Sequence, residues 1–214
     1  MENFNNVLEA LKKNNMDPYF VENEKAAVDL AFSMIEKGST VGVGGSVTLN
    51  QLGVLDILRN GDYNFLDRYA TTDREEIEEI FHKTLLADTY LCSANAITEN
   101  GELYNVDGTN NRVAALLYGP KSVIVIAGVN KIVKDLEEAV LRVKTIAAPL
   151  NCKRLNKKTY CAEKGICQAL CAESQGIADG CLSPDRICRN YVISGPQVQK
   201  NRIKVILVNK NLGY

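Results

Sequence analysis

Apolar residues recur along the chain at helical or strand-like spacing, and they predict alternating helices and strands. Residues 4–11 and 27–35 place apolar side chains three or four positions apart, which predicts two amphipathic helices separated near Asp17 and Pro18. The short β-branched run Thr40–Val43 predicts a buried strand. A glycine-containing loop and a helix near residues 49–58 are expected to follow it.

The middle of the chain continues this alternation. Apolar runs at 63–66, 90–92 and 122–127 predict further strands, and the spacing within 77–85 and 133–143 predicts further helices. Segments 96–98 and 103–104 flank Asn100-Gly101, a strong signal for a β-hairpin. Strands that alternate with helices are typical of a mainly parallel sheet covered by helices on both faces, so the predicted fold class is α/β.

The periodicity fails between residues 147 and 190, a stretch rich in Cys, Lys, Gly and Pro. It is longer than an unstructured loop normally runs inside a compact domain. The apolar runs 191–194 and 203–208 predict two strands that rejoin the sheet. Because 214 residues suit one hydrophobic core, we expect a single domain over 1–214 with a cysteine-rich, metal-binding insert at 147–190.

Composition and charge exclude several classes of protein. The hydrophobic share of 46% and the charged share of 24% are typical of globular chains. With 25 basic and 26 acidic residues, the net charge is −1, so neither nucleic acid nor an anionic membrane surface is expected as a partner. No apolar run has the length of a signal peptide core or a membrane span, and we therefore expect a cytoplasmic protein.

Six of the seven cysteines lie between Cys152 and Cys188. Thiolates are soft ligands that favour zinc or iron–sulfur centres, and cysteines in a reducing compartment are more often metal ligands than disulfides. From Cys161 onward the intervals are five, three, nine and six residues, without the Cys-x-x-Cys pairs of zinc ribbons. This spacing favours an iron–sulfur cluster over zinc, which stays the alternative metal; a redox pair or incidental thiols are the competing interpretation.

A glycine-rich loop follows the predicted strand Thr40–Val43. Gly44 and Gly45 allow backbone N–H groups to approach an oxyanion, and Ser46 and Thr48 add hydroxyl donors. The loop therefore indicates a phosphate or carboxylate site, although a tight turn that needs glycine for its geometry explains it equally well. Asn130 and Lys131 follow a predicted strand end, where ligands bind in such sheets; solvated side chains are the alternative.

Polar residues around the predicted hairpin could carry chemistry. Glu99 could act as a nucleophile or base, Asp107 as a second acid and Arg112 as an anion clamp. The alternative is that Glu99, Asp107 and Asn110 build turns, which these residue types do well.

Four pieces of the sequence resemble the LUD-domain family, the lactate-utilisation proteins. These pieces are VGVGGSVTLNQLG, ENGELYNVDGTNNRVAALLYGPKSVIVIAGVNKIV, LEEAVLRVKTIAAPLN and SPDRICRNYVI. The resemblance implies a NagB/RpiA/CoA-transferase-like fold, in which the loop with Gly44, Gly45 and Ser46 borders the ligand. Thr98-Glu99-Asn100-Gly101 also resembles the Ser-Glu-Asn-Gly motif of CoA transferases, whose glutamate forms the acyl-enzyme.

The same resemblance assigns the metal ligands. The family pattern Cys-x5-Cys-x2-Cys-x6-Cys matches Cys161, Cys167, Cys181 and Cys188 if residues 168–180 contain an insertion, and Cys171 is a rival for Cys181. It implies a protein that binds a small anionic metabolite and a 4Fe–4S cluster and serves lactate or related organic-acid oxidation beside a redox protein partner. The alternative is a CoA-transferase-like or sugar-phosphate isomerase-like enzyme that uses Glu99 and holds a structural zinc.

Overall fold

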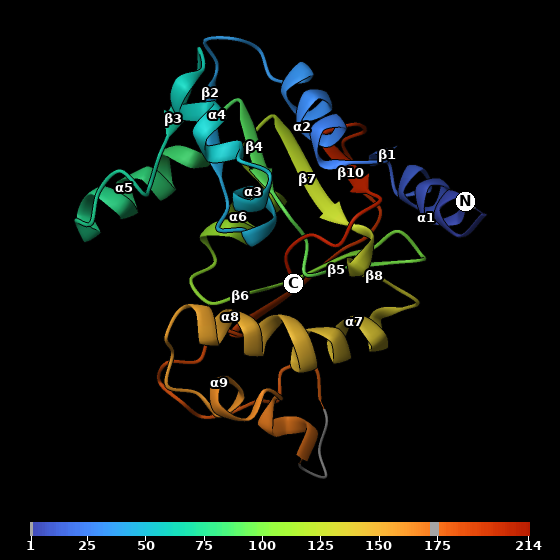
Figure 1. Cartoon of the computed structure of the whole chain (residues 1–214), viewed down its shortest axis with the longest axis vertical. Helices are drawn as coiled ribbons and strands as arrows, with labels where there is room; N and C mark the ends of the chain where they lie inside the picture. Colours follow the sequence, from blue (N-terminus) through green and yellow to red (C-terminus); the bar gives the residue numbers. More distant parts are fainter. Residues whose placement is uncertain (1, 172–175) are drawn as a thin grey trace.

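Two β-sheets organise the computed structural model, which describes residues 2–171 and 176–214 (Figure 1). Within these residues the main sheet has six parallel strands in the order β1-β10-β7-β4-β2-β3, and a second sheet has four strands in the order β8-β5-β6-β9. The main-sheet strands are β1 (Asp17–Val21), β2 (Thr40–Val43), β3 (Asn64–Leu66), β4 (Thr89–Cys92), β7 (Ser122–Gly128) and β10 (Ile203–Val208). The second sheet contains β5 (Ala96–Thr98), β6 (Leu103–Asp107), β8 (Ile132–Val133) and β9 (Asn190–Ser194).

Helices cover both faces of the main sheet, as the sequence predicted. Successive residues of β7 point to opposite faces, so Val123 packs in one buried cluster and Ile124 in another. The first cluster includes Val7 and Leu116, from α1 and α6, and the second includes apolar residues of α2, α3 and α4. The bounds are α1 (Glu2–Lys13), α2 (Glu24–Ser33), α3 (Val47–Gln51), α4 (Val54–Asn60), α5 (Arg74–Thr84) and α6 (Asn111–Leu117).

A long helical segment lies along the second sheet, and α9 lies beyond it (Figure 1). The buried side chains of the long segment, among them Ala139 and Val143, share a cluster with Tyr104 of β6. The segment consists of α7 (Leu136–Arg142), a π-helical turn (Val143–Ala147) and α8 (Ala148–Arg154). Short helices follow at α9 (Tyr160–Lys164) and Gln168–Cys171, and a 3-10 turn precedes β8 at Val129–Lys131.

The predicted hairpin is confirmed. Ile97 of β5 pairs with Leu103 of β6 in antiparallel register. Gly101 in the turn has a φ of 78°, a conformation that favours glycine. A Cβ atom there would stand 2.5 Å from the backbone of Ala10, so the turn packs tightly against α1.

Several predicted elements were wrong in detail. Asp17 and Pro18 separate two helices, as predicted, but they also begin the edge strand β1, which was not predicted; Pro18 is tolerated there because an edge strand can lack one N–H donor. The helix expected at 49–58 is divided at Gly53, which has a φ of 67°. The helical pattern does not stop at residue 147 but continues to Arg154. The two late strands join different sheets, β9 the second and β10 the main one. The insert boundaries at 147 and 190 stay a prediction.

Candidate functional site

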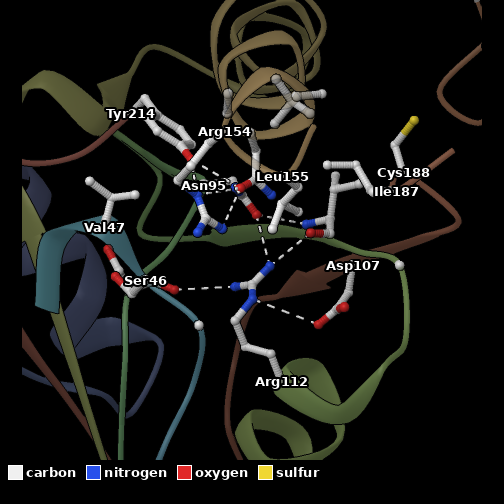
Figure 2. Close-up of a pocket in the computed structure, with 18 of the residues that line it drawn as sticks. Ser46, Val47, Asn95, Asp107, Arg112, Arg154, Leu155, Ile187, Cys188 and Tyr214 are labelled. Atoms are coloured by element: carbon white, nitrogen blue, oxygen red, sulfur yellow. Dashed lines mark hydrogen bonds and ion pairs between the residues drawn. The ribbon is translucent and has the colours of Figure 1, made fainter. Parts of the chain in front are cut away.

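A cavity of about 310 Å³ lies between the two sheets and the long helical segment (Figure 2). The segments that follow β2, β4 and β7 reach it from the main sheet, which fits the tendency of α/β proteins to bind ligands at the carboxyl ends of parallel strands. The end of β6 and one face of α8 close it from the other side. Its polar lining includes Ser46, Thr48, Arg68, Ser93, Asn95, Asp107, Arg112, Lys131, Asn151, Arg154 and Tyr214.

The glycine loop after β2 forms part of the cavity wall. Gly45, Ser46 and Thr48 line the cavity, and the hydroxyl of Ser46 accepts a hydrogen bond from the N–H of Leu49 at the start of α3. Gly44 lies behind the wall, where a Cβ atom would stand 2.6 Å from the hydroxyl of Tyr90. The packing of Gly44 supports the interpretation as a tight turn, and the role of the loop in anion binding stays a prediction.

Lys131 is a buried cation in the cavity wall. Only 3% of the residue is exposed, and its ammonium group donates hydrogen bonds of 2.9 Å to the hydroxyls of Thr48 and Ser93. Burial lowers the pKa of Lys131 to about 7, and the positive charges of Arg142 and Arg112 act in the same direction. A large fraction of Lys131 is therefore an uncharged amine near neutral pH.

Asn130, the other predicted ligand-binding residue at this strand end, is not part of the cavity wall. Its side-chain oxygen accepts a hydrogen bond of 3.0 Å from the N–H of Leu212, and its amide donates to the carbonyl of Gly213. Asn130 thus fixes residues 212–213 beside the site, while its neighbour Lys131 faces the cavity.

Arg112 joins the two sheets rather than standing free as an anion clamp. Its guanidinium donates hydrogen bonds to the backbone carbonyls of Ser93 and Val106 and to the side-chain oxygens of Asn95 and Asn105. Its Nε also forms an ion pair of 3.7 Å with Asp107. Much of its donor capacity is therefore used within the protein, and its role as an anion clamp stays a prediction.

Asp107 is occupied in a similar way. Its carboxylate accepts hydrogen bonds from the backbone N–H groups of Thr109, Asn110 and Val113, which fixes the turn into α6. The turn-building interpretation of the sequence therefore holds for Asp107. It lines the cavity beside Arg112, and its role as an acid stays a prediction.

Residues that the sequence did not single out complete the wall. Arg154 and Asn151 reach the cavity from α8. The hydroxyl of Tyr214 accepts a hydrogen bond of 2.8 Å from Arg154 (Figure 2) and donates one of 2.9 Å to Asn151. Continued helical spacing through residues 147, 151 and 154 was the signal that could have identified them. Arg68 also lines the cavity, and its buried Nε has no hydrogen-bond partner among the described residues.

The charges around the cavity do not balance. Among the residues described, its wall holds the cations Arg68, Arg112 and Arg154 and the partly charged Lys131, but the single side-chain carboxylate Asp107, which already accompanies Arg112. Lys131 is buried, Arg68 and Arg112 are partly buried and Arg154 is exposed, so the cost of desolvating positive charge falls mainly on Lys131. The wall therefore carries an excess of positive side-chain charge.

Glu99 lies away from this cavity. It is exposed in the turn between β5 and β6, and its backbone N–H donates to the carbonyl of Val133. Neither its backbone nor its side chain is part of the cavity wall. The predicted role of Glu99 as a nucleophile is untested, and its position lends that role no support.

Four cysteines interact with one another beside the cavity. A hydrogen bond from Cys152 lowers the pKa of the Cys161 thiol, and the hydroxyl of Thr159, 3.4 Å from the Cys161 sulfur, acts in the same direction. Burial raises the pKa of Cys167, and the nearby Cys188 and Cys161 thiols add to that rise. Cys188 is also part of the cavity wall, so the cysteine group and the cavity adjoin.

Cys181 and Cys171, the two candidates for the remaining metal ligand, have different surroundings. Cys181 is buried, and Arg186 donates hydrogen bonds to the backbone carbonyls of both Cys181 and Cys188, which ties these two segments together. Cys171 is exposed, with its sulfur 3.9 Å from the hydroxyl of Tyr160.

The choice between the two metals stays a prediction. In the part of the chain that the structure describes, no three His, Cys, Asp or Glu side chains lie close enough to hold one metal ion. Four converging thiolates would complete the first shell of either a zinc ion or an iron–sulfur cluster.

The described residues contain no helix that is both long and apolar enough to cross a bilayer.

Comparison with known proteins assigns the family. The model of the LUD domain matches residues 4–208, and no curated protein matches the chain. A crystal structure of a DUF162 family protein from Deinococcus radiodurans is 15% identical, with a TM-score of 0.53, and the match covers 97% of this chain and 96% of that one. A weaker likeness, with a TM-score of 0.37 and 21% identity, is to eIF2B delta from Chaetomium thermophilum, and it covers 55% of this chain and 50% of that chain. Another, with a TM-score of 0.34 and 13% identity, is to ribose 5-phosphate isomerase from Plasmodium falciparum, and it covers 83% of this chain and 78% of that chain. The near-complete match to the DUF162 protein shows a shared fold, and the family model over residues 4–208 shows that this chain belongs to the LUD-domain family.

Proposed function

We propose that this LUD-domain protein binds a small organic anion in the cavity between its sheets and takes part in lactate or related organic-acid oxidation. The observation that carries the proposal is the excess of positive charge around the cavity, where Arg68 and Arg154 have no side-chain carboxylate partner within the described wall. The hydroxyl of Ser46 in the glycine loop, which also lines the cavity, complements these cations. A carboxylate of metabolite size fits both the charge and the volume.

The proposal includes a 4Fe–4S cluster held by Cys161, Cys167, Cys188 and, as the fourth ligand, Cys181. Burial and the contact with Arg186 support Cys181 over the exposed Cys171. When bound, such a cluster supplies single-electron transfer. Cys188 lines the anion cavity, so an electron-transfer group and an organic anion would be neighbours, and a redox protein would be the partner.

Anion binding is tested by calorimetric titration with lactate, pyruvate and uncharged lactamide. We expect the two carboxylates to bind and lactamide not to bind. Arg154→Met should weaken carboxylate binding about tenfold, since a charge-assisted contact contributes roughly 1.5–3 kcal/mol. Lys153→Met is the matched control, because Lys153 is an exposed neighbour on the same helix and is not part of the cavity wall. If neither carboxylate binds, the proposal fails.

The cluster is tested by purification without oxygen, with iron and sulfide analysis and a visible spectrum. We expect brown protein that loses iron in Cys161→Ser and Cys167→Ser and keeps it in Cys92→Ser, whose thiol is buried in β4. Cys171→Ser and Cys181→Ser decide between the rivals. Colourless protein without iron contradicts the cluster, and one zinc per chain in its place supports the alternative metal.

A transferase or isomerase that uses Glu99 was the alternative from the sequence. Glu99 is exposed on the hairpin and outside the cavity wall. No observation favours this second function, and we do not propose it.

A further inference from the structure

Lys131 has surroundings that differ from those of an ordinary ligand-binding lysine. It is nearly inaccessible from outside the molecule, yet it lines the cavity. The titratable groups that act on it are the cations Arg112 and Arg142, together with the thiol of Cys92. Lysines that are desolvated and placed beside other cations lose their proton at neutral pH and become nucleophiles.

The hydrogen bonds of Lys131 leave its amine free to react. Thr48 donates its own hydroxyl to the carbonyl of Leu212, and Ser93 is oriented towards the carbonyl of Ala94, so both hydroxyl oxygens act as acceptors for Lys131. An uncharged amine has two N–H groups, which these two oxygens satisfy. Its lone pair then has no role within the described residues other than reaction with a ligand.

Close packing holds the amine in this position. Gly213 approaches so tightly that a Cβ atom there would stand 2.6 Å from the Thr48 hydroxyl and 3.4 Å from the Lys131 nitrogen. Arg142, which donates to the carbonyls of Asn130 and Asn95, supports the backbone on the other side. The Lys131 side chain is therefore preorganised, as nucleophilic catalysis requires.

We infer that Lys131 is a nucleophile that forms an imine with the carbonyl group of an anionic carbonyl compound, of the 2-oxo acid class, held in the cavity. This inference rests on the proposed function, because a 2-oxo acid is the oxidised form of a 2-hydroxy acid. The amine lone pair forms a bond to the carbonyl carbon as the carbon–oxygen π bond breaks, and one N–H proton passes to the oxygen to give a carbinolamine. The second N–H proton passes to the hydroxyl group, the carbon–oxygen bond breaks, water leaves, and a carbon–nitrogen double bond remains. No oxidant or reductant is consumed.

The surrounding groups fit each part of this step. The wall cations Arg68 and Arg154 can hold the carboxylate, which leaves Lys131 to approach the adjacent carbonyl. The hydroxyls of Thr48 and Ser93 lie at hydrogen-bond distance from the reacting nitrogen and can carry protons to and from the carbinolamine.

Reductive trapping tests the inference. The full-length protein is incubated with pyruvate and cyanoborohydride, and intact and peptide mass spectra are recorded. We expect a single reduced pyruvate adduct on the peptide that contains Lys131. Lys131→Arg and Lys131→Met should lose this adduct, whereas Lys134→Arg should keep it, because Lys134 is an exposed lysine outside the cavity wall. Acetone, which lacks the carboxylate, should give no adduct.

The outcomes separate the two proposals. If pyruvate binds by calorimetry but no adduct forms, or if the adduct maps to other lysines, the imine is overturned and the anion site stands. If neither pyruvate nor lactate binds and no adduct forms, both are overturned. A Lys131→Arg variant that still binds pyruvate but yields no adduct supports the imine, because that variant keeps the charge and lacks the reactive amine.

Discussion

At the scale of single residues, the molecule buries positive charge without matching carboxylates. Lys131 and Arg142 are both buried, and hydrogen bonds to hydroxyl and carbonyl oxygens are the contacts that satisfy them among the described residues. Such oxygens solvate a cation but do not neutralise it. The cost of burying these charges falls on the folded protein.

The pH dependence of stability should reveal this cost at Lys131. A lysine has a pKa of about 10.4 when unfolded, and burial lowers the pKa of Lys131 in the folded protein to about 7. Between these values the unfolded state binds the proton and the folded state does not. The loss of folding stability caused by burying the charged Lys131 is therefore largest below pH 7. It diminishes as pH rises, by up to about 1.4 kcal/mol per pH unit.

We expect urea denaturation of the wild type and of Lys131→Met to differ most below pH 7. The variant lacks the buried ammonium group and should there be more stable by about 1–3 kcal/mol. The difference should shrink towards pH 9. A difference that stays constant with pH would show that Lys131 keeps an ordinary pKa.

The two loop glycines should respond differently to the same substitution. Gly44→Ala places a methyl group against the buried hydroxyl of Tyr90, so we expect a loss of about 1–3 kcal/mol in the free energy of unfolding. In Gly45→Ala the new methyl group meets the end of Arg68, a flexible side chain that can shift. This variant should keep most of its stability and bind carboxylates more weakly. Urea denaturation and calorimetry measure the two effects, and equal stability losses would contradict the assignment.

At the scale of elements, the π-helical turn Val143–Ala147 determines which face of α8 meets the cavity. Asn151 and Arg154 follow this turn and line the cavity together, while Cys152 between them contacts Cys161. A π turn carries an extra residue compared with an α turn, and such turns are frequent at functional sites. The rotation it introduces brings these side chains into place.

Deleting Leu150 should abolish this placement. Leu150 is an exposed residue of α8, and loss of one residue from a regular α-helix rotates the residues after it by about 100°, which turns Arg154 and Asn151 away from the cavity. We expect carboxylate binding to fall at least about tenfold, measured by calorimetry, with near-native circular dichroism. Leu150→Ala is the control, since it keeps the length of the helix. Undiminished binding in the deletion variant would show that the face of α8 turned to the cavity does not matter for binding.

Some elements could be predicted from the sequence and others could not. Local signals sufficed where the pattern was strong, as in the Asn100-Gly101 hairpin and the apolar strand β7. They failed at β1, whose Pro18 resembles a helix break, and at α8, where the π turn shifts the apolar spacing. Pairing between distant segments decides which sheet each of β9 and β10 joins, and no local pattern encodes that pairing.

The candidate site was predictable to a similar extent. The glycine loop and Lys131 follow strand ends, and strand ends can be recognised from sequence. Arg68 and Arg154 reach the cavity from segments whose placement depends on tertiary packing. Glu99 carried the most suggestive local motif and yet lies outside the cavity wall, because the hairpin turn faces α1.

At the scale of the whole molecule, the cavity is shared by the main sheet, the second sheet and the long helical segment. A ligand there contacts all three, so its binding energy should stabilise the entire fold. At one hundred times its dissociation constant, pyruvate should add about 2.7 kcal/mol and raise the melting temperature by about 5–10 °C. Scanning calorimetry measures the shift, which should be smaller in Arg154→Met at the same concentration. Two separate thermal unfolding transitions would show that the two sheets unfold independently.

The position of β10 has a consequence for synthesis of the protein. In the described part of the main sheet β10 is the only neighbour of β1, with Asp17 opposite Lys204, and it also supplies one edge of β7. A ribosome translates β1 and β7 well before β10, so the nascent chain carries two strands whose shared partner does not yet exist. Pairing across so long a stretch of sequence is slow, and unpaired apolar strands aggregate. The growing polypeptide therefore has its greatest need of chaperones before β10 leaves the ribosomal tunnel.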